Sequence, residues 1–255
     1  MENSEVLEAA IDAGRIILES GGETYRVEET ILRVCRAFGV ADADCFVTPT
    51  GIIVSVKDSA GRVVSQVKSI ESRTVNLDKI SRVNDLSRRL STKAAELGQV
   101  REQLRAIDAA AGYSKYVILA ASSVGAGVFT LLFGGDLRDA AVGCVIGFLI
   151  RLLIMLQKAA GVNDFFVNVT GGAVAALVAL IAQRYGIAAH LNVIVIGSIM
   201  LLVPGMAIMN AIRDTIAGDL LSGVSRGVEA LLIAAAIAVG TGIVMLLWVK
   251  MLGGF

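Results

Sequence analysis

Pro204–Leu232 carries charged side chains between two strongly apolar stretches of the chain. At membrane depth such charges cost about 2.5–3.5 kcal/mol each on insertion scales unless they are paired or hydrated. A guanidinium can bind a carboxylate through two parallel hydrogen bonds, and a carboxyl near an apolar boundary can titrate near neutral pH. This chemistry favours a substrate and proton pathway made of Asn210, Arg213, Asp214, Asp219, Arg226 and Glu229.

The same segment has to turn the chain. Pro204 lacks an amide hydrogen and clashes with the preceding turn, so it is expected to break the helix together with Gly205. Gly218 and Gly223 are the other expected breaks, and half-helix ends beside them could point their dipoles at a substrate. From the residues alone, 204–227 is either a re-entrant segment or a cytoplasmic loop whose charges face water.

The composition divides the chain into two parts. Residues 1–115 hold 16 of the 23 Lys and Arg and 17 of the 23 Asp and Glu, whereas the remaining 140 residues are mostly apolar. The net charge is zero and no basic patch is interleaved with aromatic residues, which argues against a nucleic-acid partner. The cysteines show no metal-ligand spacing, so no metal site is expected; they are Cys35, Cys45 and Cys144.

Residues 1–115 are predicted to form a cytoplasmic α+β domain. Two helices at helical apolar spacing come first, and Gly21-Gly22 separates them. β-Branched residues then indicate a hairpin or meander whose turn is KDSAG, residues 57–61. Residues 76–108 follow as one long amphipathic helix whose apolar stripe is expected to pack on the strands in a two-layer arrangement.

Residues 116–255 are predicted to form an all-α membrane domain of about five transmembrane helices. Each apolar stretch is about long enough to cross a hydrocarbon core of roughly 30 Å. The basic residues near the ends of these stretches favour a cytoplasmic N-terminus and an external C-terminus. The predicted spans are Tyr116–Phe133, Ala140–Leu156, Phe165–Ala182, Ile187–Val203 and Val228–Val249.

Several polar or small residues lie within these spans. Gly143 and Gly147 form a GxxxG pair that favours close helix packing. Asn168–Gly172 fits either a local helix break or packing, and both interpretations stay open. His190 is the only histidine, and it is interpreted as a polar residue at the outer interface rather than as a proton relay.

A family resemblance is carried by several motifs. The run LLVPGMAIMNAIRDTIAGDLLSGVSRGVEAL resembles the signature of the threonine/serine exporter family of secondary transporters. GGETYRVEETILRVC, FVTPTGIIVSV and VNLDKISRVNDLSR are similar to the cytoplasmic domain of the same family. Within the first of these, Glu23, Arg26 and Glu28 match the family pattern and are interpreted as structural ion pairs or gating contacts.

The resemblance implies a non-enzymatic membrane protein that exports threonine, serine or a dicarboxylate such as succinate. Full-length members carry a second apolar half, so the chain resembles the larger subunit of a split form, similar to the succinate-exporter component. That implies a plasma-membrane protein that works with a small integral membrane partner. No cofactor is expected, an oligomer is a further possibility, and coupling to protons is expected from the carboxyls of Asp214, Asp219 or Glu229. The alternatives to a transporter are a membrane-anchored sensor or scaffold and a serine hydrolase, the latter suggested by the GxSxG pattern at Gly223–Gly227.

Overall fold

The computed structural model describes residues 3–57, 61–92 and 95–253. Their contacts form two compact units, one made of Met1–Gly112 with Gly205–Val228 and the other of Tyr113–Pro204 with Glu229–Phe255. The sequence division placed 204–227 with the membrane spans. In the structure Gly205–Val228 packs with the N-terminal unit, because polar side chains of this segment are buried there.

The first unit contains a three-stranded antiparallel meander. Strands β1 (Ala43–Thr48), β2 (Gly51–Lys57) and β3 (Val63–Ser69) follow one another in space as in sequence. On β2, Ile52 and Val54 are buried while Ile53 between them is exposed, so one face of the sheet is covered. The meander expected from the β-branched runs is present, although residues 58–60 of its turn lie outside the described residues.

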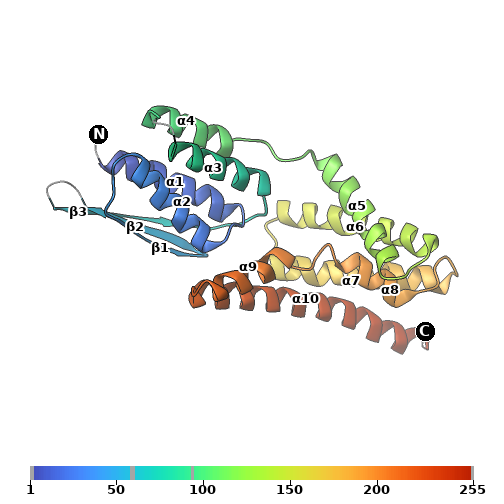
Figure 1. Ribbon diagram of the computed structural model, residues 1–255. Helices are drawn as coiled ribbons and strands as arrows, with labels where there is room; N and C mark the ends of the chain where they lie inside the picture. The colour runs from blue at the N-terminus through green and yellow to red at the C-terminus, as the bar shows by residue number, and fades with distance from the viewer. Residues whose placement is uncertain (1–2, 58–60, 93–94, 254–255) are drawn as a thin grey trace. The chain divides into compact units, whose positions relative to one another are not determined.

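Two pairs of helices cover that face in successive layers. Helices α1 (Asn3–Glu19) and α2 (Thr24–Ala37) contact the sheet, and α3 (Leu77–Leu90) and α4 (Leu97–Asp108) contact α1 and α2 (Figure 1). Helix α1 buries apolar side chains around most of its circumference, apart from one polar stripe that includes Glu8, Asp12 and Arg15, so it needs packing partners on more than one side. The α+β class therefore holds for this unit, but the two-layer prediction is wrong because the stripe of α3 and α4 packs on helices rather than on strands.

The single long helix predicted at 76–108 is also wrong. Helix α3 ends at Leu90 and α4 begins at Leu97, and residues 93–94 between them lie outside the described part of the chain. One continuous helix would be about 50 Å long, whereas α1 beneath it measures about 26 Å at 1.5 Å per residue. The break lets both halves bury their apolar stripes on the same short helices.

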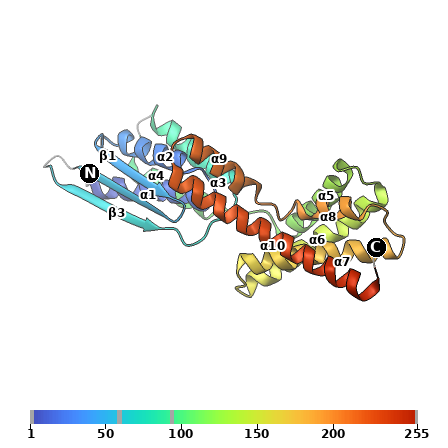
Figure 2. The same ribbon diagram turned by 90° about the horizontal axis from the view of Figure 1, so that it is seen from below.

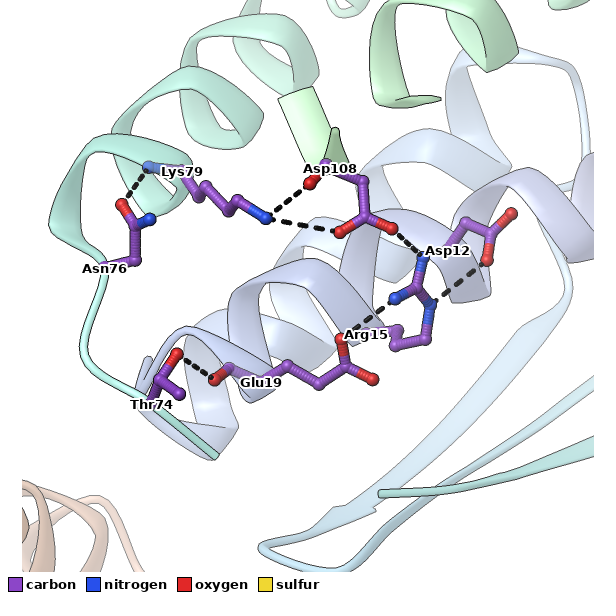
Figure 3. A network of polar contacts seen from close by, with 7 residues as sticks. All are labelled: Asp12, Arg15, Glu19, Thr74, Asn76, Lys79 and Asp108. Atoms are coloured by element: carbon purple, nitrogen blue, oxygen red, sulfur yellow. Dashed lines mark hydrogen bonds and ion pairs between the residues drawn. The ribbon is translucent and has the colours of Figure 1, made fainter. Parts of the chain in front are cut away.

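A polar network fixes the C-terminal end of α1 (Figure 3). The guanidinium of Arg15 donates to Glu19 at 2.9 Å and to Asp108 at 2.8 Å. The ammonium of Lys79 donates to the Asp108 carbonyl at 2.5 Å. The backbone of Thr74 donates to the Glu19 carbonyl at 2.7 Å. These contacts hold α1, α3 and α4 together directly beside the loop that follows α1.

Two thiols of this unit provide a test of its packing. Burial raises the pKa of Cys35 to about 11 and that of Cys45 to about 12. Because the thiolate is the reactive species, a Cys144→Ser variant should alkylate at pH 8 about 100-fold or more slowly than an ordinary thiol. Mass spectrometry with iodoacetamide measures this rate, and the urea-unfolded variant is the control. Rapid labelling in the folded state would contradict the packing of β1 against α2.

The second unit consists of helices. They are α5 (Lys115–Leu132), α6 (Leu137–Ala159), α7 (Asp164–Arg184), α8 (Leu191–Ile199) and the part of α10 (Leu220–Leu252) from Glu229 onward. Among the described residues, four helices are long and apolar enough to cross a membrane, namely α5, α6, α7 and α10. The predicted span Ile187–Val203 yields only the nine-residue α8, about 13 Å long, which is too short to cross a core of roughly 30 Å.

Glycines allow the membrane helices to approach closely. A Cβ on Gly143 would lie 3.2 Å from the Ala126 carbonyl oxygen of α5, and one on Gly147 would lie 2.5 Å from that of Ser122. The packing interpretation of the GxxxG pair is therefore confirmed. Helix α7 runs unbroken through Asn168–Gly172, so packing also accounts for that motif.

Candidate functional site

Most of the polar face of α9 (Gly205–Ile216) is buried within the first unit, although the Arg213 side chain on that face is 51% exposed. Asn210 and Asp214 are 1% and 0% exposed, whereas Ile212 and Ile216 on the apolar face are 51% and 82% exposed. Helix α9 lies next to the N-terminal helices of this unit (Figure 2). A helix of a soluble protein buries its apolar side, whereas α9 exposes its apolar side. This arrangement requires polar partners for the buried side chains and an apolar environment around the exposed ones.

An ion pair lies at the centre of this buried region. The Arg226 Nε lies 3.1 Å from the Asp214 Oδ2, and the Arg226 side chain is only 4% exposed. The same guanidinium donates through Nη2 to the Gly22 carbonyl at 2.8 Å. A buried pair of this kind is strongly destabilised when one partner is removed, because the other charge is then left uncompensated. The pair thus joins α9, α10 and the loop between α1 and α2.

The segment Gly21–Thr24, which comprises the loop after α1 and the first residue of α2 and is called the loop below, supplies the other contacts. Asn210 donates to the Gly21 carbonyl at 2.8 Å, and the Arg213 Nη1 donates to the Glu23 Oε1 at 2.6 Å. The Thr24 hydroxyl donates to the Asp219 Oδ2 at 2.8 Å. The Thr24 backbone N–H donates to the Asp214 Oδ1 at 3.3 Å. We refer to Asn210, Arg213, Asp214, Asp219 and Arg226 as the charge cluster.

The turn between α9 and α10 positions Asp219. Gly218 has a φ of +93°, a left-handed conformation that favours glycine, and Asp219 then caps α10 by accepting from the Ser222 N–H at 3.0 Å. Gly205 begins α9 directly after Pro204. Gly223 was expected to break the helix, but it lies inside α10.

Gly223 has a packing role instead. A Cβ there would lie 3.0 Å from the Ala211 carbonyl oxygen and 2.1 Å from the Thr215 hydroxyl oxygen. The absence of a side chain therefore lets α9 and α10 touch, which brings Asp214 and Arg226 together.

The pKa values of the carboxyls around the cluster are shifted in opposite directions. Burial raises the pKa of Asp214, although Thr24 and Arg226 oppose the shift. Burial likewise raises the pKa of Glu28, which also experiences the charges of Asp219 and Asp214. For Asp219, burial opposes ionisation, but hydrogen bonds from Ser222 and Thr24 outweigh it and hold the pKa below its usual value. Asp214 is therefore the acid of the cluster best suited to take up a proton.

Five of the six residues that the sequence singled out lie in this one region. The sixth, Glu229, is exposed and belongs to the second unit. Sequence reasoning missed Thr24, whose polar groups contact both Asp214 and Asp219. The available signal was the GGET motif, in which the neighbouring Glu23 was interpreted as a structural or gating residue.

His190 takes part in a separate contact within the second unit. Its Nδ1 lies 2.7 Å from the Oδ2 of Asp139, a carboxylate that is 0% exposed. The backbone N–H groups of Ala189 and His190 donate to the other oxygen of Asp139 at 3.0 and 3.3 Å. These bonds hold the start of α8 to the start of α6.

The serine-hydrolase interpretation finds no support in the geometry. Ser225 of the GxSxG pattern lies inside α10 and donates to the Leu221 carbonyl at 2.7 Å, so it is not on a strand-to-helix turn. Within the described residues, no group of three or more His, Cys, Asp or Glu side chains could hold a metal ion.

Comparison with known proteins finds one family model, described as "Putative threonine/serine exporter", that covers both the loop and the charge cluster. The sequence profile of threonine/serine exporters matches residues 8–248, which include Gly21–Thr24 and all of α9. The chain belongs to the threonine/serine exporter family. The match also covers the four described helices that are long enough to cross a membrane, apart from the last residues of α10.

Relatives in the family are named as transporters. The chain is 26% identical to a "Probable threonine/serine exporter" of Mycobacterium tuberculosis over 94% of the chain and 46% of that protein. It is 24% identical to a "Threonine/serine exporter" of Corynebacterium glutamicum over 93% of the chain and 50% of that protein. The chain thus spans about half the length of these two exporters.

A third relative has a similar length to the chain. It is a "Probable succinate transporter subunit" of Klebsiella aerogenes, 21% identical over 97% of the chain and 95% of that protein. None of these three relatives is named as an enzyme. No solved structure matches the chain significantly.

Proposed function

We propose that the chain is one subunit of a proton-coupled secondary transporter that exports a small metabolite bearing a carboxylate. The buried Arg226–Asp214 pair is the observation that carries this proposal. It combines a guanidinium suited to a substrate carboxylate with an acid whose raised pKa suits proton uptake. Threonine, serine and succinate are the candidate substrates, because proteins with those substrates in their names are relatives of the chain.

The apolar surface of the first unit supports a location in the membrane. Besides the exposed face of α9, the start of α10 exposes Leu220, Leu221 and Val224, each by more than half. A surface of this kind needs lipid or another membrane protein to cover it. Together with the half-length match to two exporters, this favours a partner that supplies the second half of the transporter, with the N-terminal domain in the cytoplasm and the chain in the plasma membrane.

Efflux measurements test this function. Cells loaded with labelled threonine, serine or succinate should release one of them faster when the chain is expressed with a small membrane partner than with either protein alone. A protonophore should slow that release because the proton gradient drives it. Equal release by the chain alone, purified and reconstituted as a monomer, would contradict the split-transporter proposal. Release of none of the three would favour the sensor or scaffold alternative.

A further inference from the structure

The contacts of the charge cluster converge on one short loop. Among the residues that the structure describes, five hydrogen bonds join Gly21–Thr24 to the cluster, across more than 180 positions of sequence. Glu23 and Thr24 are 7% and 0% exposed. In this conformation the loop contacts Asn210, Asp214 and Arg226, the buried side chains of the cluster that would have to meet a substrate.

We propose that Gly21–Thr24 is an internal ligand of the transport site and has to leave the charge cluster before a substrate binds. The inference rests on the proposed transport function and adds a mode of regulation to it. The loop and the substrate compete for the same groups, so only molecules with an open loop can bind substrate. The apparent affinity for substrate is therefore the intrinsic affinity multiplied by the fraction of molecules in which the loop is open.

The loop presents the functional groups of a small polar metabolite. Glu23 offers a carboxylate to Arg213, and Thr24 offers a hydroxyl to Asp219. The Gly22 carbonyl occupies the guanidinium of Arg226. A substrate carboxylate can replace the two acceptors, and it binds the guanidinium of Arg226 more strongly than the neutral Gly22 carbonyl does. Thr24 is instead a donor to Asp219, so a hydroxyl or ammonium group of the substrate would take its place.

The site also holds a polar atom that the loop does not satisfy. The Oδ1 of Asn210 is buried and has no hydrogen-bond partner among the described residues, although the Nδ2 of the same amide binds the Gly21 carbonyl. A buried acceptor without a partner carries a desolvation penalty, which a donor on a bound ligand would remove. The covered site therefore lacks one hydrogen-bond donor, which a ligand with an N–H or O–H group can supply.

Two glycines shape the loop directly after α1. Gly21 has a φ of +85°, and a Cβ on Gly22 would lie 2.4 Å from Ile17. The polar network of Figure 3 anchors the end of α1 immediately before these glycines. On the other side of the loop, Glu23 at the N-cap of α2 provides no side-chain cap, and Asp214 accepts from Thr24 in its place.

Protonation of Asp214 couples opening of the loop to proton binding. The neutral carboxyl would attract neither Arg226 nor the positive N-terminal end of α2. The bond from the Thr24 N–H to Asp214 would therefore weaken, and Arg226 would lose its counterion and attract a substrate carboxylate more strongly. The other charged groups that face Asp214 are Asp219 in the turn before α10 and Glu28 on α2. Both are carboxyls, and in their ionised form they favour protonation of Asp214.

Hydrogen–deuterium exchange of the full chain in detergent tests the inference directly. Saturating threonine, serine or succinate, whichever is exported, should speed exchange of amides in 21–24 by about tenfold or more, because binding exposes the displaced loop. Peptides from α4 serve as the internal reference. A ligand that left this loop unchanged or protected it further would overturn the inference, while export in cells would still uphold the transport function.

Variants of the loop provide a second readout. Thr24→Val removes the hydroxyl at nearly constant volume, so the half-saturation concentration for export should fall about five- to tenfold as the loop opens more often. Thr24→Ser restores the hydroxyl and should bring the wild-type value back. If Thr24→Val raised the half-saturation concentration, or changed only the amount of protein, the loop would be a structural support. If no substrate were bound or exported by any form, both proposals would fail together.

Discussion

Asn in place of Asp214 is expected to lower net export on the order of 100-fold, equivalent to about 2.7 kcal/mol. The amide keeps the shape of the side chain but cannot carry a proton. Exchange of internal for external substrate needs no net proton movement, so exchange should persist in Asp214→Asn. The measurements are net efflux and counterflow from loaded vesicles at equal membrane abundance.

The pH dependence of the same variant has a definite sign. Burial raises the pKa of Asp214, so this carboxyl is protonated at a higher pH than an ordinary aspartate with a pKa of about 3.9. Wild-type export should therefore show a step whose midpoint lies above that value, and Asp214→Asn should remove it. Asp78→Asn on α3 is the matched control, because Asp78 is exposed and pairs only with the nearby Arg82 in the described contacts.

Variants of Arg226 distinguish a loss of transport from a loss of folding stability. Arg226→Gln leaves the Asp214 charge buried without its counterion, which can cost about 3–5 kcal/mol of stability. Adding Asp214→Asn to Arg226→Gln removes the unpaired charge, so the double variant should regain the wild-type protein level but not net export. Exchanging the charges, Asp214→Arg with Arg226→Asp, tests whether pairing alone is sufficient. If Asp214, Asp219, Arg226 and Glu229 could each be neutralised without loss of export, a sensor or scaffold would be the better interpretation.

Alanine in place of Gly240 is the second change with a large expected effect. In the second unit, a Cβ on Gly240 of α10 would lie 1.9 Å from the Val169 carbonyl oxygen and 3.0 Å from the Ala173 nitrogen of α7. Both atoms belong to the backbone and cannot rotate away. Separating the two helices should destabilise the unit by about 3 kcal/mol or more, at the upper end of what overpacking costs.

Gly242→Ala provides a control on the same helix. No atom lies within 4 Å of a Cβ built at Gly242, so alanine there should be neutral or should gain up to about 1 kcal/mol of helix propensity. Thermal unfolding in detergent and membrane abundance compare the two variants. Equal stability of Gly240→Ala and Gly242→Ala would show that α7 and α10 do not touch at this position.

Much of the local structure follows from the sequence itself. The apolar stretches predict α5, α6, α7 and α10 because a helix must satisfy its own backbone in a membrane and present apolar side chains to lipid. The β-branched runs predict the meander, and the Gly21-Gly22 pair predicts the end of α1. The charges of Pro204–Leu232 stood out because charged groups between apolar stretches are costly unless they are paired or functional.

Other features depend on contacts between segments far apart in the chain. The apolar stretch around α8 resembles a span, but its helix ends after nine residues at Ile199. The apolar stripe of α3 and α4 looks suited to cover strands, yet α1 and α2 cover the sheet and the stripe packs on these helices instead. Periodicity shows which face of a helix is apolar, but it does not say which partner that face meets.

The sequence alone determined the membrane helices, the α+β class of the N-terminal unit and five residues of the charge cluster, because hydrophobic period, turn chemistry and isolated charges are local properties. Only the tertiary structure decided that α9 buries its polar face, that Asp214 pairs with Arg226, and that Thr24 contacts both Asp214 and Asp219. These outcomes depend on how the buried charges obtain their counterions and hydrogen bonds. The partner loop lies more than 180 residues away, so no local pattern around α9 could identify it.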